Sequence, residues 1–401
     1  MSNPVADSSG NPYSSFGCIV TGERLVGREE LLSQLTTDFC DNVQSVSLVG
    51  PPRIGKSSFA SELFRRIYVH QPDRPFVWVT VSAESQDFSC IFNDIVDGVL
   101  STSRNAIAGN NPTIFQKYEQ PADDARESYR RCRNLLEVAN RCKVRTLVVF
   151  DEFDAVRKFP EAGLGIQQIR ELLYHPNRFG LSAIIVSRRR LKLIERWVPD
   201  ISTLAGVCPG YYITPLTRSA IQQMIGRSRG RIPEADDVID LVYRTTGGHP
   251  WLADMILHDA WKYGDVAGSV ASTVAERMDY YDDLVSLIRR EEEDLYDALL
   301  QLCIDNGPVE KPGSAAQLER YGIIRRVDTS GGFRYQGWSA DFQEYLQVLL
   351  RQKSLFQVWQ QTEIAVRDLI ENVLRENLGE DWLHQISHKH RSLQPVIQEA
   401  R

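Results

Sequence analysis

The sequence S-V-S-L-V-G-P-P-R-I-G-K-S-S occupies residues 45–58 and decides the fold of this chain. Its centre, Gly50 to Ser57, fits the pattern G-x-x-x-x-G-K-[ST], in which backbone N–H groups converge on phosphate oxygens. The apolar residues before Gly50 predict a buried strand, and the residues after Ser57 predict a helix whose N-terminus adds partial positive charge. The stretch therefore predicts a phosphate-binding loop between a strand and a helix.

The side chains of this loop have predicted tasks. Lys56 reaches the β- and γ-phosphates of a nucleotide, and the Ser57 hydroxyl is placed to bind Mg²⁺. Gly50 and Gly55 let the backbone bend. We expect the whole loop to contact the nucleotide, which means Gly50, Pro51, Pro52, Arg53, Ile54, Gly55, Lys56, Ser57 and Ser58. A Gly/Pro turn that fits the pattern by chance is the alternative.

An acidic pair at the end of a second apolar run argues against chance. Residues 146–150 predict a buried strand, and Asp151 and Glu152 follow it directly. Parallel α/β sheets bind ligands at the carboxyl ends of their strands. Asp151 is suited to hold Mg²⁺, directly or through water, and Glu152 to orient and deprotonate an attacking water. Helix capping is the alternative for this pair, and Asp154 is expected to be structural.

Three further motifs lie on either side of these two. V-G-R-E stands at residues 26–29, upstream of the loop. A third predicted strand, at 182–187, ends in Ser187 and is followed by Arg188, Arg189 and Arg190. G-H-P stands at residues 248–250, where two glycines followed by a proline predict a helix stop and a restart.

All five motifs together resemble the STAND-type P-loop ATPases of the AAA+/STAND group, which have archaeal and bacterial members. The resemblance covers about residues 22–263. Origin-recognition and other DNA-handling AAA+ ATPases share the first three of these motifs, V-G-R-E, the phosphate-binding loop and the acidic pair. G-H-P is therefore the main motif that distinguishes the STAND group from them.

The resemblance implies a site for ATP and Mg²⁺ between an α/β domain and a helical lid. Val26, Arg28 and Pro250 would lie against the adenine, and Pro215 is predicted to contact the nucleotide as well. Arg188 would read the γ-phosphate, as the sensor-1 arginine does. Either of two arginines, Arg170 or Arg178, could act in trans as an arginine finger. His249 is expected to be a packing residue.

The predicted fold class is α/β, with the parallel sheet of a P-loop NTPase. Five segments are expected: a flexible leader at 1–21, the nucleotide-binding domain at 22–213, the helical lid at 214–285, a winged-helix-like domain at 286–350 and a helical tail at 351–401. Within the first domain, residues 76–81 predict a strand and about 88–140 predict helices. Helical patterns resume at 214 and at 236–243.

The expected winged helix combines helices at 294–303 and 315–321 with a hairpin at 322–336. Such modules bind DNA in some proteins, whereas in STAND ATPases they mostly hold the inactive state closed. Arg325 and Arg326 offer positive charge, but the acidic run 291–294 counters it, which favours packing. The tail at 354–378 is amphipathic and resembles the start of HEPN-like domains, without their R-x(4–6)-H nuclease pattern. It predicts coupling to an effector or to another copy.

Composition excludes several classes of protein. In 401 residues, 42% are hydrophobic and 25% charged, as in soluble globular proteins. The net charge of −7 argues against a surface that grips nucleic acid everywhere. A basic stretch at 126–145 is interpreted as a solvated helix face, with a subunit or nucleic-acid contact as the alternative. Seven scattered cysteines without a C-x-x-C pair and the lack of a membrane-spanning run predict a cytoplasmic protein.

We therefore expect an ATP-dependent molecular switch of the kind found in bacterial signalling or antiphage defence. Its partners would be further copies of itself or an effector protein, with no membrane contact. The alternative is a DNA-associated AAA+ ATPase, of origin-recognition or transposition type, that grips duplex DNA with the winged helix. A nucleotide-binding scaffold with negligible turnover is a third possibility, which the presence of Glu152 disfavours.

Overall fold

The computed structural model describes residues 10–14, 16–72, 76–81, 87–108, 118, 120–197, 203–291, 293–305, 312–330, 332–379 and 381–389. The chain divides into two compact units, Met1–Gln343 and Glu344–Arg401. No helix among these residues is long and apolar enough to cross a membrane.

A five-stranded parallel sheet forms the centre of the first unit. Its strand order is β2 (Phe76–Thr80), β3 (Thr146–Asp151), β4 (Leu181–Ser187), β1 (Val46–Val49) and β5 (Gly210–Tyr212). Because all strands run in one direction, the carboxyl ends of β1, β3 and β4 meet at one edge. The predicted α/β class is confirmed, and so are the four predicted strands, which are β1, β2, β3 and β4. The short β5 was not predicted, since three residues show no clear periodicity.

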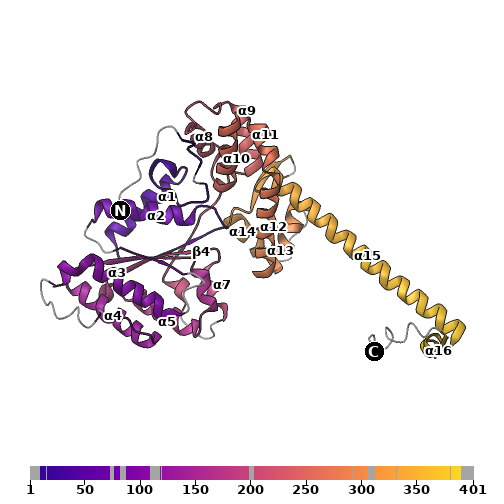
Figure 1. Ribbon diagram of the computed structural model, residues 1–401, viewed down its shortest axis with the longest axis horizontal. Helices are drawn as coiled ribbons and strands as arrows, with labels where there is room; N and C mark the ends of the chain where they lie inside the picture. Colours follow the sequence, from indigo (N-terminus) through magenta and orange to yellow (C-terminus); the bar gives the residue numbers. More distant parts are fainter. Residues whose placement is uncertain are drawn as a thin grey trace. The chain divides into compact units, whose positions relative to one another are not determined.

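Helices cover both faces of this sheet (Figure 1). On one face lie α1 (Glu29–Asp41) and α2 (Lys56–His70), and on the other lie α3 (Phe88–Ala108), α4 (Ala125–Arg141) and α5 (Ala162–Tyr174). Successive strand residues alternate between the two cores, as the two-residue repeat of a strand requires. In β3, for example, Val149 packs with α1 and α2, while Phe150 packs with α3 to α5.

Short elements connect the layers. They are the helices α6 (Pro176–Phe179) and α7 (Leu191–Ile194), and the 3-10 turns Gly22–Arg24, Phe153–Lys158, Glu195–Trp197 and Leu204–Gly206.

Several residues of the basic stretch on and after α4 are paired within the chain. Arg130 pairs with Glu127 at 2.5 Å, and Arg141 with Glu137 at 3.0 Å. Arg131 is buried and donates to the Tyr118 carbonyl at 3.0 Å. The pairs with Glu127 and Glu137 agree with a balanced, solvated helix face, whereas the buried Arg131 does not belong to it.

Helices follow the sheet in the order α8 (Arg218–Gly226), α9 (Asp236–Thr246), α10 (Pro250–Tyr263), α11 (Val266–Ser272) and α12 (Val274–Glu291). The pattern expected to turn helical at Thr214 does so only at Arg218, because Thr217 caps the helix by accepting from the Ala220 N–H. Neither α11 nor α12 was predicted as a separate helix, and α12 runs across the expected domain boundary at 285–286.

The expected flexible leader is packed where it is described. Tyr13 is fully buried, and its hydroxyl donates to the Met224 carbonyl at 2.7 Å. The same carbonyl accepts the Arg227 N–H at 3.2 Å, so this contact adds a second donor at the end of α8. Further along, the Val20 N–H donates to Ser58 Oγ at 3.1 Å. Residues 1–9 and 15 of the leader lie outside the described residues.

The remainder of this unit has α13 (Glu293–Leu300), a π turn (Gln301–Asp305), α14 (Pro312–Arg320) and the antiparallel hairpin of β6 (Ile324–Thr329) and β7 (Gly332–Gly337). This order of helices and hairpin agrees with the expected one, and the identification as a winged helix stays a prediction. After the hairpin, the ring of Trp338 stacks on Phe342 with centroids 4.5 Å apart.

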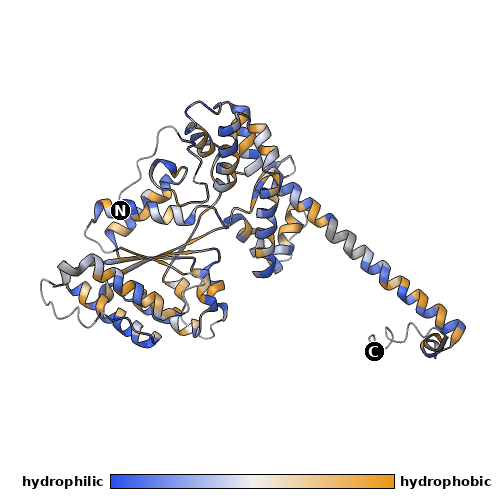
Figure 2. Ribbon diagram, in the orientation of Figure 1, coloured by the Kyte–Doolittle hydropathy of each residue, from blue (hydrophilic) through white to orange (hydrophobic). Residues whose placement is uncertain are grey.

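The second unit is helical. It contains most of α15 (Ala340–Leu378), which includes the predicted helix at 354–378, and α16 (Trp382–Lys389). Figure 2 shows apolar and polar residues alternating along this part of α15. Its large exposed apolar side chains include Trp359, Val366, Leu369, Ile370 and Val373. At 3.6 residues per turn, these five fall on one face of the helix.

Candidate nucleotide-binding site

The loop from Gly50 to Gly55 joins β1 to α2, and both glycines are required by its shape. Gly55 precedes α2 with φ of 94°, in the left-handed region that other residues rarely adopt. A Cβ on Gly50 would lie 2.5 Å from the Ile213 carbonyl oxygen, so a side chain would collide with the chain after β5. The local sequence thus fixes an open loop before a helix N-terminus.

Lys56 lies in the first turn of α2 and folds back over the loop. Its Nζ donates to the Gly50 carbonyl at 2.9 Å and to the Pro51 carbonyl at 2.7 Å. Burial lowers the pKa of Lys56 to about 8. A buried ammonium held only by neutral carbonyls is poised to exchange them for phosphate oxygens, which bind it more strongly.

Ser57 and Asp151 meet although they are 94 residues apart in sequence. Ser57 Oγ donates to Asp151 Oδ1 at 3.0 Å, and the Glu152 N–H donates to the same oxygen at 3.0 Å. Burial raises the pKa of Asp151. The structure therefore brings together the two predicted Mg²⁺ ligands.

This pair fits the chemistry of Mg²⁺. Protein sites for this ion use one or two oxygen side chains and leave the other positions to substrate phosphates and water. In the part of the chain that is described, no cluster of three or more His, Cys, Asp or Glu side chains could hold a metal ion on its own. The Ser57–Asp151 pair supplies two oxygen side chains, which fits an Mg²⁺ ion bound together with a nucleotide.

A cavity of about 730 Å³ lies beside this pair. Of the predicted site residues it is lined by Pro52, Arg53, Lys56, Ser57, Asp151, Glu152 and Arg188. The three residues predicted to be catalytic, Lys56, Glu152 and Arg188, therefore share one space. Asp154 has the expected structural role, because its carboxylate accepts the Arg188 N–H at 2.7 Å and the Arg189 N–H at 3.1 Å.

A second cavity, of about 200 Å³, lies along the loop and the start of α2. It shares four lining residues with the first cavity, Arg53, Lys56, Ser57 and Trp251. The other predicted residues around it are Val26, Arg28, Ile54, Gly55, Ser58 and Pro250. Gly50 and Pro51 line neither cavity, and they act through the carbonyls that hold Lys56.

Pro215 is placed elsewhere. It lines neither cavity, and a Cβ on Gly322 would lie 2.4 Å from its ring. The next residue, Leu216, lines the smaller cavity instead. The cavities therefore give no support to Pro215 as a nucleotide contact, and that role stays a prediction.

The two candidate arginine fingers also lie outside both cavities of their own chain. The Arg170 guanidinium lies over the Tyr174 ring, 4.8 Å from its centroid. Arg178 pairs with Glu137 at 3.3 Å. A role for either one in trans stays a prediction.

Several site residues were missed in the sequence. Trp251 lines both cavities, and the Arg53 guanidinium lies 4.2 Å from its ring centroid. The larger cavity is also lined by Tyr280 and by carboxylates of α12, which are Glu276, Asp279 and Asp283. Trp251 could have been suspected from its place after G-H-P. No motif marked α12.

One carbonyl links the loop to two helices beyond the sheet. The Tyr280 hydroxyl donates to the Pro52 carbonyl oxygen at 3.0 Å, and His249 Nε2 lies 3.3 Å from the same oxygen. Burial lowers the pKa of His249 to about 3, so the ring is neutral. This agrees with the packing role expected for His249.

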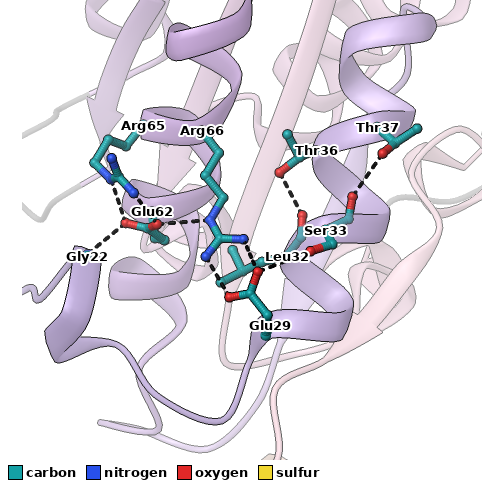
Figure 3. A network of polar contacts seen from close by, with 9 residues as sticks. All are labelled: Gly22, Glu29, Leu32, Ser33, Thr36, Thr37, Glu62, Arg65 and Arg66. Atoms are coloured by element: carbon teal, nitrogen blue, oxygen red, sulfur yellow. Dashed lines mark hydrogen bonds and ion pairs between the residues drawn. The ribbon is translucent and has the colours of Figure 1, made fainter.

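An ionic network fixes the V-G-R-E segment to α2 (Figure 3). Arg66 makes two bonds to the Glu29 carboxylate, at 2.6 and 2.7 Å, and one to Glu62 at 2.9 Å. The buried Glu62 carboxylate also accepts from Arg65 and, at 2.8 Å, from the Gly22 N–H. The hydrogen bond with Arg65 is the main reason that the pKa of Glu62 falls to about 2. The network thus holds the segment that carries Val26 and Arg28.

Comparison with known proteins agrees with this geometry. Residues 24–186 match the family described as AAA ATPase domain. No curated protein matches the chain. Among solved structures, a Walker-type ATPase of Pyrococcus abyssi, PABY2304, is similar with a TM-score of 0.52 and 15% identity, over 80% of this chain and 96% of that one.

Two further structures are similar at lower scores. The Aeropyrum pernix ORC1 protein in complex with DNA has a TM-score of 0.45 and 16% identity, over 83% of this chain and 94% of that one. Cdc6p from Pyrobaculum aerophilum has a TM-score of 0.43 and 14% identity, over 85% of this chain and 97% of that one. Residues 24–186 are thus similar to AAA ATPase domains, and the likeness to the Pyrococcus protein shows a P-loop α/β fold.

Proposed function

We propose that the chain is an ATP-hydrolysing molecular switch of STAND type, which works in signalling or antiphage defence. The observation that carries the proposal is the hydrogen bond between Ser57 and Asp151, with Lys56, Glu152 and Arg188 around the same cavity. This set matches the parts that phosphoryl transfer needs: a cradle, a metal site, a base and a reader of the γ-phosphate.

Each of these residues then has a defined task. Ser57 and Asp151 hold Mg²⁺, which neutralises charge on the β- and γ-phosphates when it is bound. Lys56 donates to the phosphate oxygens, and Arg188 donates to the γ-phosphate. Glu152 is exposed to the larger cavity, where it orients a water and accepts its proton.

A switch also needs a contact that moves with the nucleotide. The loop carbonyl of Pro52 contacts α10 and α12 through His249 and Tyr280, and both helices line the cavities. Loss of the γ-phosphate changes the charge at this contact. ATP and ADP shift the protein between two conformations only if each nucleotide binds one conformation more tightly than the other.

The output of the switch is proposed to be assembly with another copy or with an effector protein. The exposed apolar face of α15, with Val366, Leu369, Ile370 and Val373, supports this part of the proposal. Apolar faces of this kind commonly mark protein interaction sites.

Nucleotide binding and hydrolysis by Lys56→Ala and Glu152→Gln test the proposal. We expect Lys56→Ala to bind ADP and ATP at least tenfold more weakly, since charge-assisted contacts with a buried phosphate are strong. Glu152→Gln should bind ATP almost normally and hydrolyse little of it. Lys158→Ala, at an exposed lysine outside both cavities, is the control. Wild-type protein that binds neither nucleotide would refute the proposal.

A second candidate function is that of a DNA-associated AAA+ ATPase. It is favoured by the hairpin of β6 and β7, where Arg325 and Arg326 are exposed and the Arg326 guanidinium lies 4.1 Å from the Phe333 ring centroid. Fluorescence anisotropy with duplex DNA at physiological salt distinguishes the two functions. Submicromolar binding that weakens on replacing Arg325 and Arg326 would favour the DNA function. Weak binding that falls steeply with salt would favour the switch.

A further inference from the structure

The smaller cavity contains a charged pair that the site described above does not use. Asp254 lies on α10, one turn after Pro250, and Arg227 lies just after α8. Both side chains line the cavity. They are mostly buried, with exposed fractions of 16% for Asp254 and 15% for Arg227.

The hydrogen-bonding capacity of this pair is only partly used. Arg227 Nη1 lies 3.9 Å from Asp254 Oδ1, which is too long for a hydrogen bond. Arg227 Nη2 donates to the Arg24 carbonyl. Among the described residues, Asp254 Oδ1 and Arg227 Nε are buried without a hydrogen-bond partner. Buried polar atoms are nearly always paired, so an acceptor and a donor left without partners on two side chains of one cavity indicate a ligand that supplies both.

The position of the pair distinguishes the two ends of a bound nucleotide. α10 starts at the loop, where His249 and Trp251 contact Pro52 and Arg53. Asp254 lies four residues beyond Pro250, about 6 Å further along the helix axis. A carboxylate there would repel phosphates, which belong beside Lys56.

The cavity around the pair has both apolar and cationic walls, the latter from Arg24, Arg28, Arg53 and Lys56. Val26, Leu216 and Met224 line the same cavity, together with the rings of Pro250 and Trp251. The apolar part suits a flat ring system, and the cations beside the loop suit the phosphates. Burial also raises the pKa of Asp254 to about 6, although Arg227 and Arg24 oppose this. The carboxylate thus lacks the solvation that a donor from a ligand would replace.

We propose, on the basis of the nucleotide function above, that Asp254 and Arg227 read the edge of the purine base and make the site selective for adenine. Asp254 accepts from the exocyclic amino group of adenine, and Arg227 donates to the neighbouring ring nitrogen. Adenine presents this donor and acceptor side by side, whereas guanine and hypoxanthine carry an oxygen acceptor in place of the amino group. That oxygen would face the Asp254 carboxylate and be repelled.

The test compares ADP with inosine diphosphate, which differs from ADP at this group, by calorimetric titration. Wild-type protein should bind ADP about tenfold to a hundredfold more tightly, the range for a good two-point contact with a base. In Asp254→Asn the amide can donate to the oxygen of hypoxanthine, so the ratio should fall to about threefold or less. Asp259→Asn, on the same helix outside the cavity, should keep the wild-type ratio.

Each other outcome is decisive. If wild-type protein binds neither diphosphate, the proposed nucleotide function is wrong. If it binds both and the ratio is the same in Asp254→Asn, only the base-reading inference is wrong. If Asp254→Asn weakens both diphosphates equally and leaves 2′-deoxy-ADP unaffected, the carboxylate contacts the ribose, and base reading is again wrong. Thermal melts of each variant show whether it is folded.

Discussion

Replacing Glu62 by Gln perturbs the network that holds the V-G-R-E segment on α2. The Glu62 side chain is 1% exposed, and its pKa is about 2 instead of 4.5. At about 1.4 kcal/mol per pH unit, this difference corresponds to about 3 kcal/mol of stability at pH 7. Arg65 is 51% exposed, and solvent screening reduces its share, so we expect a loss of about 2–3 kcal/mol.

The stability that Glu62 contributes depends on pH. A carboxylate whose pKa is depressed in the folded state stabilises the fold above its unfolded pKa, and this stabilisation is lost as the pH falls toward the folded pKa. The difference between wild type and Glu62→Gln should therefore be full at pH 7. It should shrink below about pH 4.5 and be only about 1 kcal/mol near pH 3.

Urea unfolding followed by circular dichroism at several pH values measures this difference. Glu30→Gln removes the same charge from an exposed position on α1, and its effect should stay within about 0.5 kcal/mol. A Glu62→Gln variant as stable as wild type at pH 7, or a difference that is constant down to pH 3, would refute the reasoning from the network.

Three more predictions concern the site and the tail. The pKa of Lys56 is about 8 in the structure, and bound phosphates must raise it. ADP affinity measured by calorimetry should therefore be constant below pH 8 and fall by up to about tenfold per pH unit above it. An affinity that rises with pH would contradict this. Glu152→Gln should form a larger assembly with ATP than with ADP in light scattering, and equal masses would exclude assembly as the output. Leu369→Glu combined with Val373→Glu should abolish that assembly, whereas Asn372→Glu, at an exposed polar position on the same helix, should not.

How much of the site the sequence could predict depended on how local the signal was. The loop and the Asp151–Glu152 pair were found because a strand and the chemistry at its end lie within a dozen residues. Tyr280 was missed because it acts from a helix more than two hundred residues away, and only the fold brings it to Pro52. Asp254 was missed for the related reason that a single carboxylate on a helix carries no pattern.

Packing explains the other differences. Tyr13 looked like part of a loose leader because its neighbours are polar, yet a single aromatic ring with a donor suffices to anchor such a segment. The sequence shows that Pro215 and Leu216 are adjacent, but which of them faces the cavity depends on backbone torsions that a motif does not specify.

The shared contact at the Pro52 carbonyl has a consequence for how the protein would respond to acidity. His249 has a pKa of about 3, and burial raises the pKa of Tyr280 well above its usual value, so neither group gains or loses a proton near neutral pH. The hydrogen bonds of these two side chains at the Pro52 carbonyl therefore do not change with pH near neutrality. A change of pH would alter the affinity for the nucleotide through Lys56. It would leave the contacts of His249 and Tyr280 with the Pro52 carbonyl in place.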